Sequence, residues 1–455
     1  MENLLDIERP DSLSRVVKMA LDTGEVATVG EGYALFAKYR MTVAVSPEAA
    51  HSPAHQAALL TMVNTGRRAL LGGIQVAGDL AVPLLLPLPG LGATLAEAVA
   101  RLGGRLAMGA AWTDAPLVRL GAGGGEGAPA TLQVTFGDWR GGVFPAGEGE
   151  RLSEEASAIP AAILAGALAV GEIFQRLRGN PMAAEREVGL SLWALGAPWR
   201  GAAGPLHYVV PSRLWILGLG HLGQAFLWVL GLLPYSDPGK VELTLQDFDR
   251  LALANDSTSV LTSPPMVGAR KTREMGAWAE ARGFSTRLVE RRFDGDVRLQ
   301  EDDPRVLFCG VDNRIARAAL EDVGFDLVVE AGLGGGPQEY LAMQLHTFPG
   351  TVSARARWGD EVALARPSTV APAYDDLARR GVDKCGLVEL ASRTVGAPFV
   401  GVVAAVLAVM EVTRRLNRGE GCEVLDLTLR DPALRRVVAG PRLRRFNPGF
   451  GDLAG

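Results

Sequence analysis

A glycine-rich turn between an apolar strand and an apolar helix sets the fold class of this 455-residue chain. The run Arg213–Leu217 (RLWIL) is typical of a buried strand, and the sequence GLGHLG follows it and opens an apolar helix. In this context Gly218 allows a tight turn, Gly220 lets the backbone approach a phosphate, and Gly223 lets helix and strand pack closely. The helix N-terminus offers unpaired N–H groups to an anion. The motif therefore predicts an α/β domain that binds a nucleotide.

The next predicted strand, 241–246, ends in two carboxylates, Asp247 and Asp249. Asp247 lies 24 residues beyond Gly223. An acid at this position can accept hydrogen bonds from both ribose hydroxyls, in ATP and in NAD alike. These acids support nucleotide binding but do not separate an adenylating enzyme from a dehydrogenase.

Further polar side chains follow at separate places along the second half. They are Asn255, Arg270-Lys271 at the start of the next helix, Asp312-Asn313 at the end of the strand 305–311, and Arg317 one turn later. Lysine is rare here, with five lysines among 46 basic residues, which makes Lys271 more notable. The arginine bias is typical of GC-rich coding and favours a bacterial source.

This order of motifs resembles the superfamily of ThiF, MoeB and the ubiquitin-activating enzymes. Its pattern is GxGxxG, Asp-x-Asp, Asn, Gly-x-x-Lys and Asp-Asn-x-x-x-Arg, and the resemblance covers residues 214–345 closely and extends loosely to 416. It implies a Rossmann-like adenylation fold that uses ATP and Mg²⁺. Adenylation is the attack of a carboxylate on the α-phosphate of ATP, so it needs charge neutralisation and positioning more than proton transfer.

The resemblance also implies roles for individual residues. Asp312 would hold Mg²⁺, Lys271 would contact the phosphates and Asp247 would bind the ribose. Asn255 would contact the phosphates or the water around the metal. Asp249 and Asn313 complete the expected nucleotide contacts, whereas Arg270 and Arg317 are expected to serve structure or salt bridges.

One position departs from the family pattern. There the Asn is followed by Leu-Asn-Arg-Gln, and that arginine reaches the phosphates, whereas Thr258 stands at its place here. Either another arginine substitutes or the activity is weaker than in relatives. In the family such an arginine can come from the partner domain across the interface. Arg67 and Arg68, at the end of a first-half helix, are the candidates.

The three cysteines differ in context. Cys309 lies in an apolar strand and is expected to be a buried small side chain, and Cys422 is expected to be structural. Cys385 lies in a polar connector before the last large helix, next to Lys384, which would favour the thiolate. In the relatives the transferring cysteine sits in such a crossover segment. Cys385 is therefore the predicted nucleophile, with an inert surface thiol as the alternative.

An internal repeat relates the two halves of the chain. Residues 165–177 align without gaps on 404–416 with seven of thirteen positions identical, and a strand-like run, 190–195 or 425–429, follows each. The repeat predicts a pseudo-dimer of related domains, the first without a nucleotide loop. We expect a degenerate domain at 1–200, an active domain at 205–430 with a Pro- and Gly-containing boundary near 197–212, and a basic tail at 431–455.

Elements of the first half can also be predicted. They are paired strands over 33–45, a helix over 53–71, a strand over 73–76, a helix over 94–102 and a glycine-rich loop over 121–127. In the second half, the glycines of 330–336 would let an extended peptide tail lie close to the backbone, and a flexible turn is the alternative.

Composition excludes several classes of protein. A net charge of −5 argues against a nucleic-acid binder. Three cysteines cannot build a disulfide framework or a four-cysteine zinc site. The apolar runs 161–173 and 399–409 are shorter than the roughly 18–20 residues of a membrane span. With no visible signal peptide, we expect a cytoplasmic protein and no membrane partner.

The preferred interpretation is an activating enzyme for a ubiquitin-like protein, with a conjugating-enzyme-like protein as a further partner. The C-terminal glycine carboxylate would be adenylated and then captured by Cys385 as a thioester.

A sulfur-carrier adenylyltransferase of the ThiF/MoeB type is the alternative. Such enzymes are usually single-domain homodimers, often with CxxC zinc ligands, and this chain has no CxxC. Adenylation of a peptide or tRNA base is a third possibility. A nicotinamide-dependent oxidoreductase would not need Lys271 and Asp312 together. A homodimer of the whole chain stays open.

Overall fold

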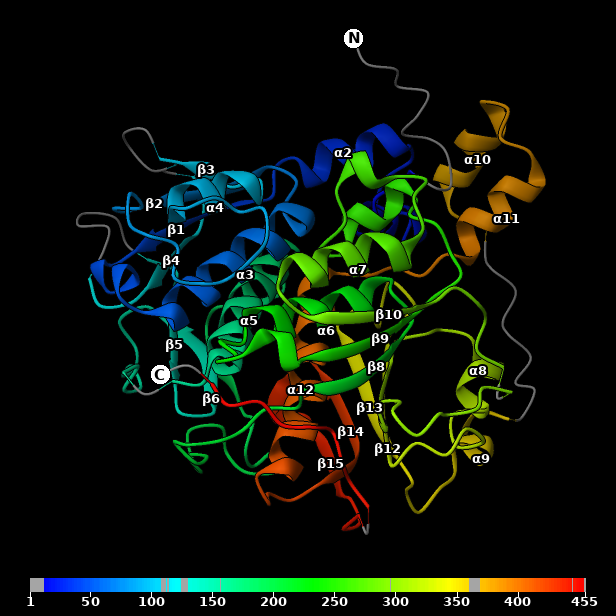
Figure 1. The fold of residues 1–455 in the computed structure, drawn as a ribbon. Coiled ribbons are helices and arrows are strands. Elements are labelled where there is room, and N and C mark those ends of the chain that lie inside the picture. Colours follow the sequence, from blue (N-terminus) through cyan, green and yellow to red (C-terminus); the bar gives the residue numbers. More distant parts are fainter. Residues whose placement is uncertain are drawn as a thin grey trace.

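The computed structural model describes residues 12–453, apart from 108–111, 113, 124–129, 156, 295, 360–368 and 444. The chain forms two β-sheets with a layer of long helices between them (Figure 1).

The elements of the first half are α1 (Arg15–Asp22), α2 (Val29–Phe36), β1 (Arg40–Val45), η2 (Pro47–Ala50), α3 (Pro53–Ala69), β2 (Gly73–Ala77), α4 (Leu95–Arg101), β3 (Arg105–Leu106), β4 (Leu117–Leu120), β5 (Leu132–Gly137), β6 (Arg140–Pro145), α5 (Ile159–Leu177) and β7 (Val188–Ser191).

The elements of the second half are β8 (Arg213–Leu217), α6 (His221–Leu232), η3 (Pro238–Lys240), β9 (Glu242–Gln246), η4 (Leu253–Ser257), η5 (Pro264–Met266), α7 (Lys271–Ala281), β10 (Ser285–Val289), β11 (Val306–Cys309), α8 (Arg314–Ala318), β12 (Leu327–Leu333), β13 (Ala342–Phe348), α9 (Ala354–Trp358), α10 (Pro372–Arg379), α11 (Lys384–Ser392), α12 (Pro398–Leu416), β14 (Cys422–Thr428), η6 (Pro432–Leu434) and β15 (Arg436–Ala439).

The two sheets have the same strand order. The first runs β3-β2-β1-β4-β5-β6-β7 and the second runs β10-β9-β8-β11-β12-β13-β14, with β15 added at its edge. In each sheet the first five strands pair in parallel and the next two pair antiparallel. The α/β fold with a related first domain is thus confirmed. In this correspondence β1 matches β8, α3 matches α6, and α5 matches α12.

The repeated helix carries the same buried acid in both halves. α5 and α12 have 19 residues each, and α12 begins 239 residues after α5. Glu172 of α5 accepts a hydrogen bond from the Ala184 N–H at 2.9 Å, and Glu411 of α12 accepts one from the Cys422 N–H at 2.8 Å. Each acid is 1% exposed. A buried carboxylate therefore ties each helix to the segment that leads into the next strand.

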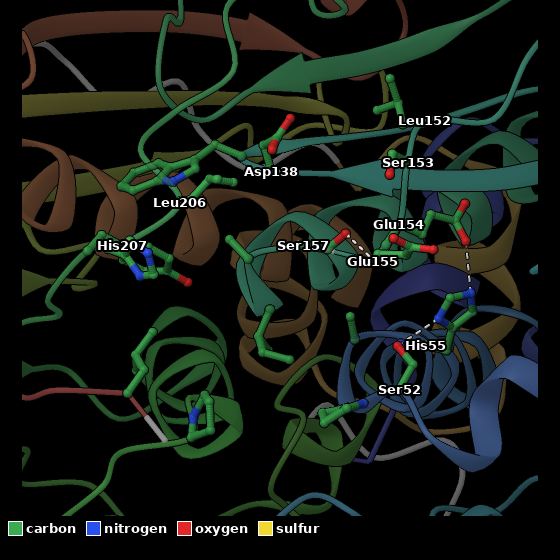
Figure 2. A pocket seen from close by; sticks show the side chains of 18 of the residues that line it. Ser52, His55, Asp138, Leu152, Ser153, Glu154, Glu155, Ser157, Leu206 and His207 are labelled. Carbon is green, nitrogen blue, oxygen red and sulfur yellow. Dashed lines mark hydrogen bonds and ion pairs between the residues drawn. The ribbon is translucent and has the colours of Figure 1, made fainter. Parts of the chain in front are cut away.

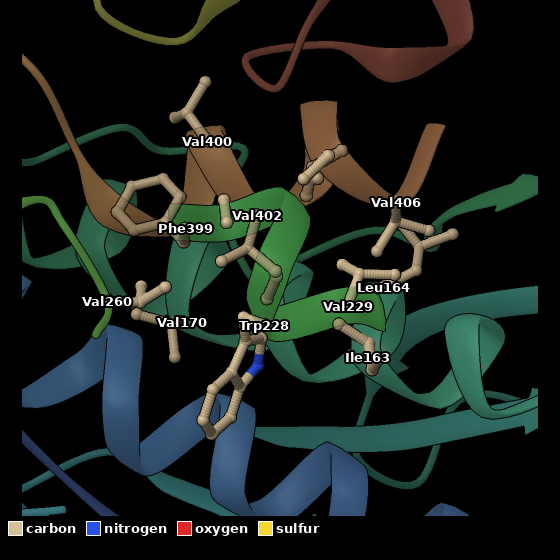
Figure 3. Close-up of a cluster of buried hydrophobic side chains, with 14 of the residues drawn as sticks. Ile163, Leu164, Val170, Trp228, Val229, Val260, Phe399, Val400, Val402 and Val406 are labelled. Atoms are coloured by element: carbon tan, nitrogen blue, oxygen red, sulfur yellow. The ribbon is translucent and has the colours of Figure 1, made fainter. Parts of the chain in front are cut away.

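The long helices join the halves through one apolar core. α5 packs on α3 and α12 packs on α6, while α5 and α12 also pack on each other. Figure 3 shows this layer, where Trp228 of α6 lies among Val170 of α5 and Phe399 of α12. The Trp228 Nε1–H donates to Thr61 Oγ1 of α3 at 3.1 Å. Because both halves contribute to the same core, each half buries apolar surface that it would otherwise expose.

The helix α5 is the single described helix that is long and apolar enough to cross a membrane. Its residues from Ile159 to Gln175 are buried in the helix layer between the sheets. Its apolar character is therefore that of a core helix, in agreement with the interpretation from the sequence.

Some sequence predictions need correction. Residues 33–36, predicted as strand, belong to the helix α2, because Thr28 caps that helix by accepting from the Glu31 N–H at 3.1 Å. The helices predicted over 53–71 and 94–102 and the strand over 73–76 are present as α3, α4 and β2. β7 begins two residues before the strand predicted at 190, and residues 124–127 of the predicted glycine-rich loop lie outside the described residues.

The last segment is not a separate tail. The strand β15 pairs with β14, and Val210 and Gly451 exchange backbone hydrogen bonds of 3.1 and 2.8 Å. The predicted tail therefore belongs to the second sheet and to the start of the second half.

Replacing Trp228 with Ala should lower the free energy of unfolding by about 3–5 kcal/mol, because the substitution opens a cavity in the shared core and removes the hydrogen bond to Thr61. Urea unfolding measures this change. Leu434→Ala, at a side chain that is 79% exposed, is the control and should leave the midpoint nearly unchanged. Equal midpoints for the wild type and Trp228→Ala would contradict a shared core.

Candidate nucleotide site

The glycine loop between β8 and α6 leaves open space at the helix N-terminus. Gly218 has φ +84°, a backbone conformation that favours glycine. A Cβ atom on Gly223 would lie 1.9 Å from the Gly218 carbonyl oxygen, so only glycine allows this contact. Gly220 caps α6, and no heavy atom lies within 4 Å of the position of a Cβ there. The N-terminus of this 12-residue helix therefore faces a space that an anion can enter.

Two acids and a lysine lie at the mouth of this loop. Asp247 Oδ2 accepts from the Leu219 N–H at 2.7 Å, and its Oδ1 accepts from the Asp249 N–H at 2.8 Å. Lys271 Nζ lies 3.0 Å from Asp249 Oδ2 and 3.9 Å from Asp247 Oδ2. The Asp247 side chain is 7% exposed and that of Asp249 is 49% exposed. Asp247 thus frames the loop, while Asp249 presents the accessible carboxylate.

Backbone contacts fix Lys271 beside these acids. The Lys271 N–H donates to the Asp249 carbonyl at 3.1 Å, and the Leu251 N–H donates to the Ala269 carbonyl at 2.9 Å. The Arg270 guanidinium donates to the Phe248 carbonyl at 2.6 Å. Arg270 therefore has the structural role expected for it, since it joins the segment that carries the acids to the segment that carries the lysine.

The two asparagines predicted to contact the nucleotide accept hydrogen bonds from nearby backbone N–H groups. Asn255 Oδ1 accepts from the Ala252 N–H at 2.8 Å, and Asn313 Oδ1 accepts from the Ala316 N–H at 3.1 Å. Both oxygens hold turns, so a nucleotide contact would fall to the amide nitrogens. Asp312 follows β11, and its side chain is exposed.

Arg15 is a candidate site residue that the sequence interpretation did not include. It begins α1 in the first half, yet its N–H donates to Ser257 Oγ at 3.2 Å and its guanidinium donates to the Thr394 carbonyl at 3.3 Å. Burial and the nearby Arg393 lower the pKa of Arg15 to about 10, although Asp312 acts in the opposite direction. A first-half arginine therefore lies within electrostatic range of Asp312. No local motif around Arg15 marks it in the sequence.

The arginines proposed from the sequence have other partners. Arg67 forms a bidentate ion pair with Asp256 at 3.1 and 2.7 Å, across the interface between the halves. Arg68 is buried and donates to the Thr262 carbonyl at 2.9 Å. Burial and the neighbouring Arg67 lower the pKa of Arg68 to about 9, against the effect of Asp256. Both arginines contact the second half, but they serve the interface rather than the open loop.

The connector that leads into α12 passes next to the start of α6, since a Cβ on Gly396 would lie 3.7 Å from His221 Nδ1. A Cβ on Gly401 would lie 2.2 Å from His221 Nε2, so α12 leaves room for the imidazole that begins α6. Burial lowers the pKa of His221 to about 4, which keeps the imidazole neutral at physiological pH. The Val395 N–H donates to the Gly335 carbonyl at 3.1 Å. The connector therefore runs between the loop and the predicted glycine segment.

Cys385 lies in the first turn of α11 and is exposed. α10 and α11 lie at the outer edge of the molecule (Figure 1), where the Tyr374 hydroxyl of α10 donates to Asp22 of α1 at 2.6 Å. None of the described contacts joins Cys385 to Asp312 or to the glycine loop. Cys309 is buried as predicted and Cys422 is buried as well, and burial raises the pKa of each thiol to about 12.

The first half has a different arrangement at the corresponding place, the turn between β1 and α3. There the Glu48 carboxylate accepts from the Ala122 N–H at 3.1 and 2.9 Å and lies 3.4 Å from the Arg151 guanidinium. A protein carboxylate therefore lies in the turn after β1 of the first half and contacts the segment after β4.

A cavity of about 1320 Å³ lies beside this turn (Figure 2). At its wall His55 contacts Ser52 Oγ and Glu154 Oε2, each at 2.8 Å. Burial alone would raise the pKa of Glu154, but His55 and Arg151 lower it.

The two halves share one topology, and one of them keeps an open glycine loop with acids and a lysine at its mouth. These features define a two-domain protein with a ThiF-type fold. The chain is 44% identical over 439 residues to the bacterial E1-like protein BilD of Collimonas sp. (strain OK412), an alignment that covers 94% of this chain and 95% of that protein. The BilD N-terminal domain family matches residues 40–192, and the BilD C-terminal domain family matches residues 210–419. The chain belongs to the bacterial E1-like BilD family, which confirms the resemblance.

Solved structures give weaker similarity. E. coli MccB is 11% identical, with 70% of this chain and 94% of that chain covered and a TM-score of 0.31. E. coli tRNA N6-threonylcarbamoyladenosine dehydratase, TcdA, is 13% identical, with 46% and 86% covered and a TM-score of 0.28. These scores are too low to support an argument about the site.

Alkylation of the native protein with iodoacetamide at pH 8 should modify Cys385 alone. Cys309 and Cys422 are buried, and with pKa values of about 12 they remain protonated at this pH. Mass spectrometry should find one adduct on the wild type and none on Cys385→Ser. A second adduct on the folded wild-type protein would contradict the burial of the other two thiols.

Proposed function

We propose that this protein adenylates the C-terminal carboxylate of a ubiquitin-like protein and then transfers it to Cys385 as a thioester. The observation that carries the proposal is Lys271, which is held beside Asp247 and Asp249 at the mouth of an open glycine loop. A dehydrogenase needs the loop and an acid, but it does not need this lysine together with Asp312.

The residues around the loop fit ATP with Mg²⁺. The N-terminus of α6 and the Lys271 ammonium supply positive charge for the phosphates. No group of three or more His, Cys, Asp or Glu side chains among the described residues forms a ready-made metal site. Mg²⁺ is commonly held by one or two carboxylates together with substrate phosphates, and the exposed Asp312 matches that requirement. When bound there, Mg²⁺ would neutralise charge on the phosphates.

The acids divide the remaining tasks. Asp249 is the more exposed acid and is available to the ribose, while Asp247 holds the Leu219 N–H and thereby the shape of the loop. Lys271 would exchange its contact with Asp249 for a phosphate oxygen when ATP enters. The amide nitrogens of Asn255 and Asn313 would complete the contacts.

Arg15 supplies the cation that Thr258 cannot. Thr258 is 6% exposed and packs close to Gly396 in the connector, so an arginine would not fit there without displacing that segment. Arg15 approaches from the first half and lies within electrostatic range of Asp312. The active site is therefore built from both halves, which gives the degenerate half a direct part in the reaction.

The second step forms a C–S bond and breaks the bond between the acyl carbon and AMP. The Cys385 thiolate attacks the acyl carbon, and AMP leaves. This step requires α10 and α11 to move toward the glycine loop. The segment 334–336 beside the connector offers a path for an extended peptide tail with a terminal glycine. A conjugating-enzyme-like protein is the expected acceptor after the thioester forms.

A sulfur-carrier adenylyltransferase is the second candidate, because adenylation is common to both activities. In that case Cys385 would form a persulfide or play no part. The absence of CxxC from the sequence and the presence of a first half that contributes Arg15 favour the ubiquitin-like substrate.

Exchange of pyrophosphate into ATP, driven by the ubiquitin-like substrate, should fall about 10²–10³-fold in Asp312→Ala and in Arg15→Ala, because each substitution removes charge at the phosphates. Arg176→Gln, in an exposed first-half ion pair, is the matched arginine control and should retain full exchange. Unchanged exchange in Asp312→Ala would show that the metal assignment is wrong. Binding of NAD(P)H without any exchange of pyrophosphate into ATP would indicate a nicotinamide-dependent oxidoreductase instead of an adenylating enzyme.

Incubation with ATP, Mg²⁺ and a ubiquitin-like protein should give a covalent adduct that dithiothreitol cleaves. Cys385→Ala should lose the adduct but keep pyrophosphate exchange, because adenylation precedes transfer. Mass spectrometry and non-reducing gels measure both species, and Lys384→Gln tests the neighbouring charge. If the adduct persists in Cys385→Ala, the nucleophile lies elsewhere.

A further inference from the structure

A buried set of ionisable side chains contacts the backbone next to Asp312. The Arg317 Nε–H of α8 donates to the Val311 carbonyl at 2.7 Å, and the same nitrogen lies 3.2 Å from Glu330 Oε1. Glu330 Oε2 lies 2.8 Å from His346 Nδ1. The Glu330 side chain has no exposed surface, and those of His346 and Arg317 are 4% and 13% exposed. These three residues are called the support cluster below.

The sheet and two short helices bring the support cluster together. Glu330 on β12 lies opposite Cys309 of β11 on one side and opposite His346 of β13 on the other. The Trp358 ring of α9 covers the cluster, with the Arg317 guanidinium 4.8 Å from its centre and the His346 ring 5.6 Å away edge-on. The cluster therefore lies near the carboxyl end of β11, which Asp312 follows.

A contribution to the free energy of unfolding does not by itself explain why these three side chains are buried together. Burying a carboxylate without exposed surface carries a desolvation cost, and well-packed apolar side chains often replace such a pair without loss. Among the described residues Glu330 Oε1 receives no directed hydrogen bond, so Glu330 acts on Arg317 mainly through its charge.

What the cluster does hold is the peptide unit immediately before Asp312. Arg317 fixes the Val311 carbonyl on one side, and Asn313 caps α8 on the other side. Asp312 thus has an exposed side chain on a backbone that is fixed at both neighbours. This is the arrangement expected of a ligand that must keep one orientation before it meets its metal.

We infer that Arg317, Glu330 and His346 are positioning residues that hold the Asp312 carboxylate in the direction of the bound Mg²⁺ and phosphates. This inference rests on the proposed function of Asp312. Mg²⁺ tolerates little departure from octahedral geometry, so the orientation of a ligand affects its affinity strongly. Loss of such supporting partners typically weakens metal binding about 10–100-fold.

Two substitutions separate the charge of the cluster from its shape. Glu330→Gln keeps the size of the side chain and removes the charge that faces Arg317. Arg317→Lys keeps a positive charge but loses the planar guanidinium that meets the carbonyl and the carboxylate together. The matched control is Arg355→Gln, because Arg355 joins α9 to Asp322 at 2.6 Å and is 70% exposed without contacting Val311.

The experiment has two readouts on the full-length protein. One is the Mg²⁺ concentration that gives half-maximal ATP binding by calorimetry, compared with ATP affinity in EDTA. The other is hydrogen exchange of backbone amides in residues 310–317 without nucleotide. Glu330→Gln and Arg317→Lys should raise the Mg²⁺ requirement about 10-fold and speed exchange in 310–317, while ATP affinity in EDTA stays within about twofold. Arg355→Gln should match the wild type in both readouts.

Unchanged exchange in 310–317 and an unchanged Mg²⁺ requirement in both variants would overturn the inference. So would an equal loss of ATP affinity with and without Mg²⁺, because that result indicates general damage rather than positioning. If ATP binding by the wild type does not depend on Mg²⁺, the metal role in the proposed function is wrong. In that case faster exchange in 310–317 would still support the ordering of this segment by the cluster, and unchanged exchange would overturn it.

Discussion

The structure depends on the apolar contact between α5 and α12. These helices carry the repeated sequence, and each packs on the helix that follows the first strand of its own half, α3 or α6. Trp228 of α6 and Phe399 of α12 belong to this layer of helices. Because this layer fixes one half on the other, the N-terminal helix α1 comes to contact η4 and α10 of the second half. Arg15 meets Ser257 and Thr394 through that packing and not through any local signal. The chemistry proposed here is thus a consequence of how two cores merge.

Much of the second half could be predicted from sequence because short-range constraints decide it. A strand, a GxGxxG turn and a helix leave few conformations, and acids at the ends of parallel strands must meet at one edge of the sheet. The repeat likewise predicted related halves, since a helix buried on all sides restricts its residues. Contacts across the interface could not be predicted in this way. Arg67 and Arg68 look available in the sequence, but the fold binds Arg67 to Asp256 and surrounds Arg68 with carbonyl groups.

The individual side chains of the site also show where a motif stops being informative. Asp247 was expected on the ribose, yet both of its oxygens accept backbone N–H groups and its neighbour Asp249 is the exposed acid. Both belong to the same Asp-x-Asp motif, and only the local backbone decides which one faces outward. The Glu330 segment is similar, because its glycines drew attention in the sequence while its buried glutamate pairs with Arg317, which contacts the Val311 carbonyl next to Asp312. A motif predicts which residues belong to the site, whereas packing decides which of their side chains are exposed.

The turn after β1 differs from the glycine loop after β8 in that its negative charge belongs to the chain itself. Glu48 places a negative charge against the Ala122 N–H and the Arg151 guanidinium, so the first half contains its own anion as a covalent part of the chain. The stabilisation that a bound ligand gives to a fold rises with the logarithm of its concentration above the dissociation constant, whereas a group of the chain itself is always present. The contacts of Glu48 are therefore present at any nucleotide concentration, whereas the proposed nucleotide would add contacts at the glycine loop only while it is bound. Because the two halves share one apolar core, any stability that a ligand adds at that loop would extend to both halves.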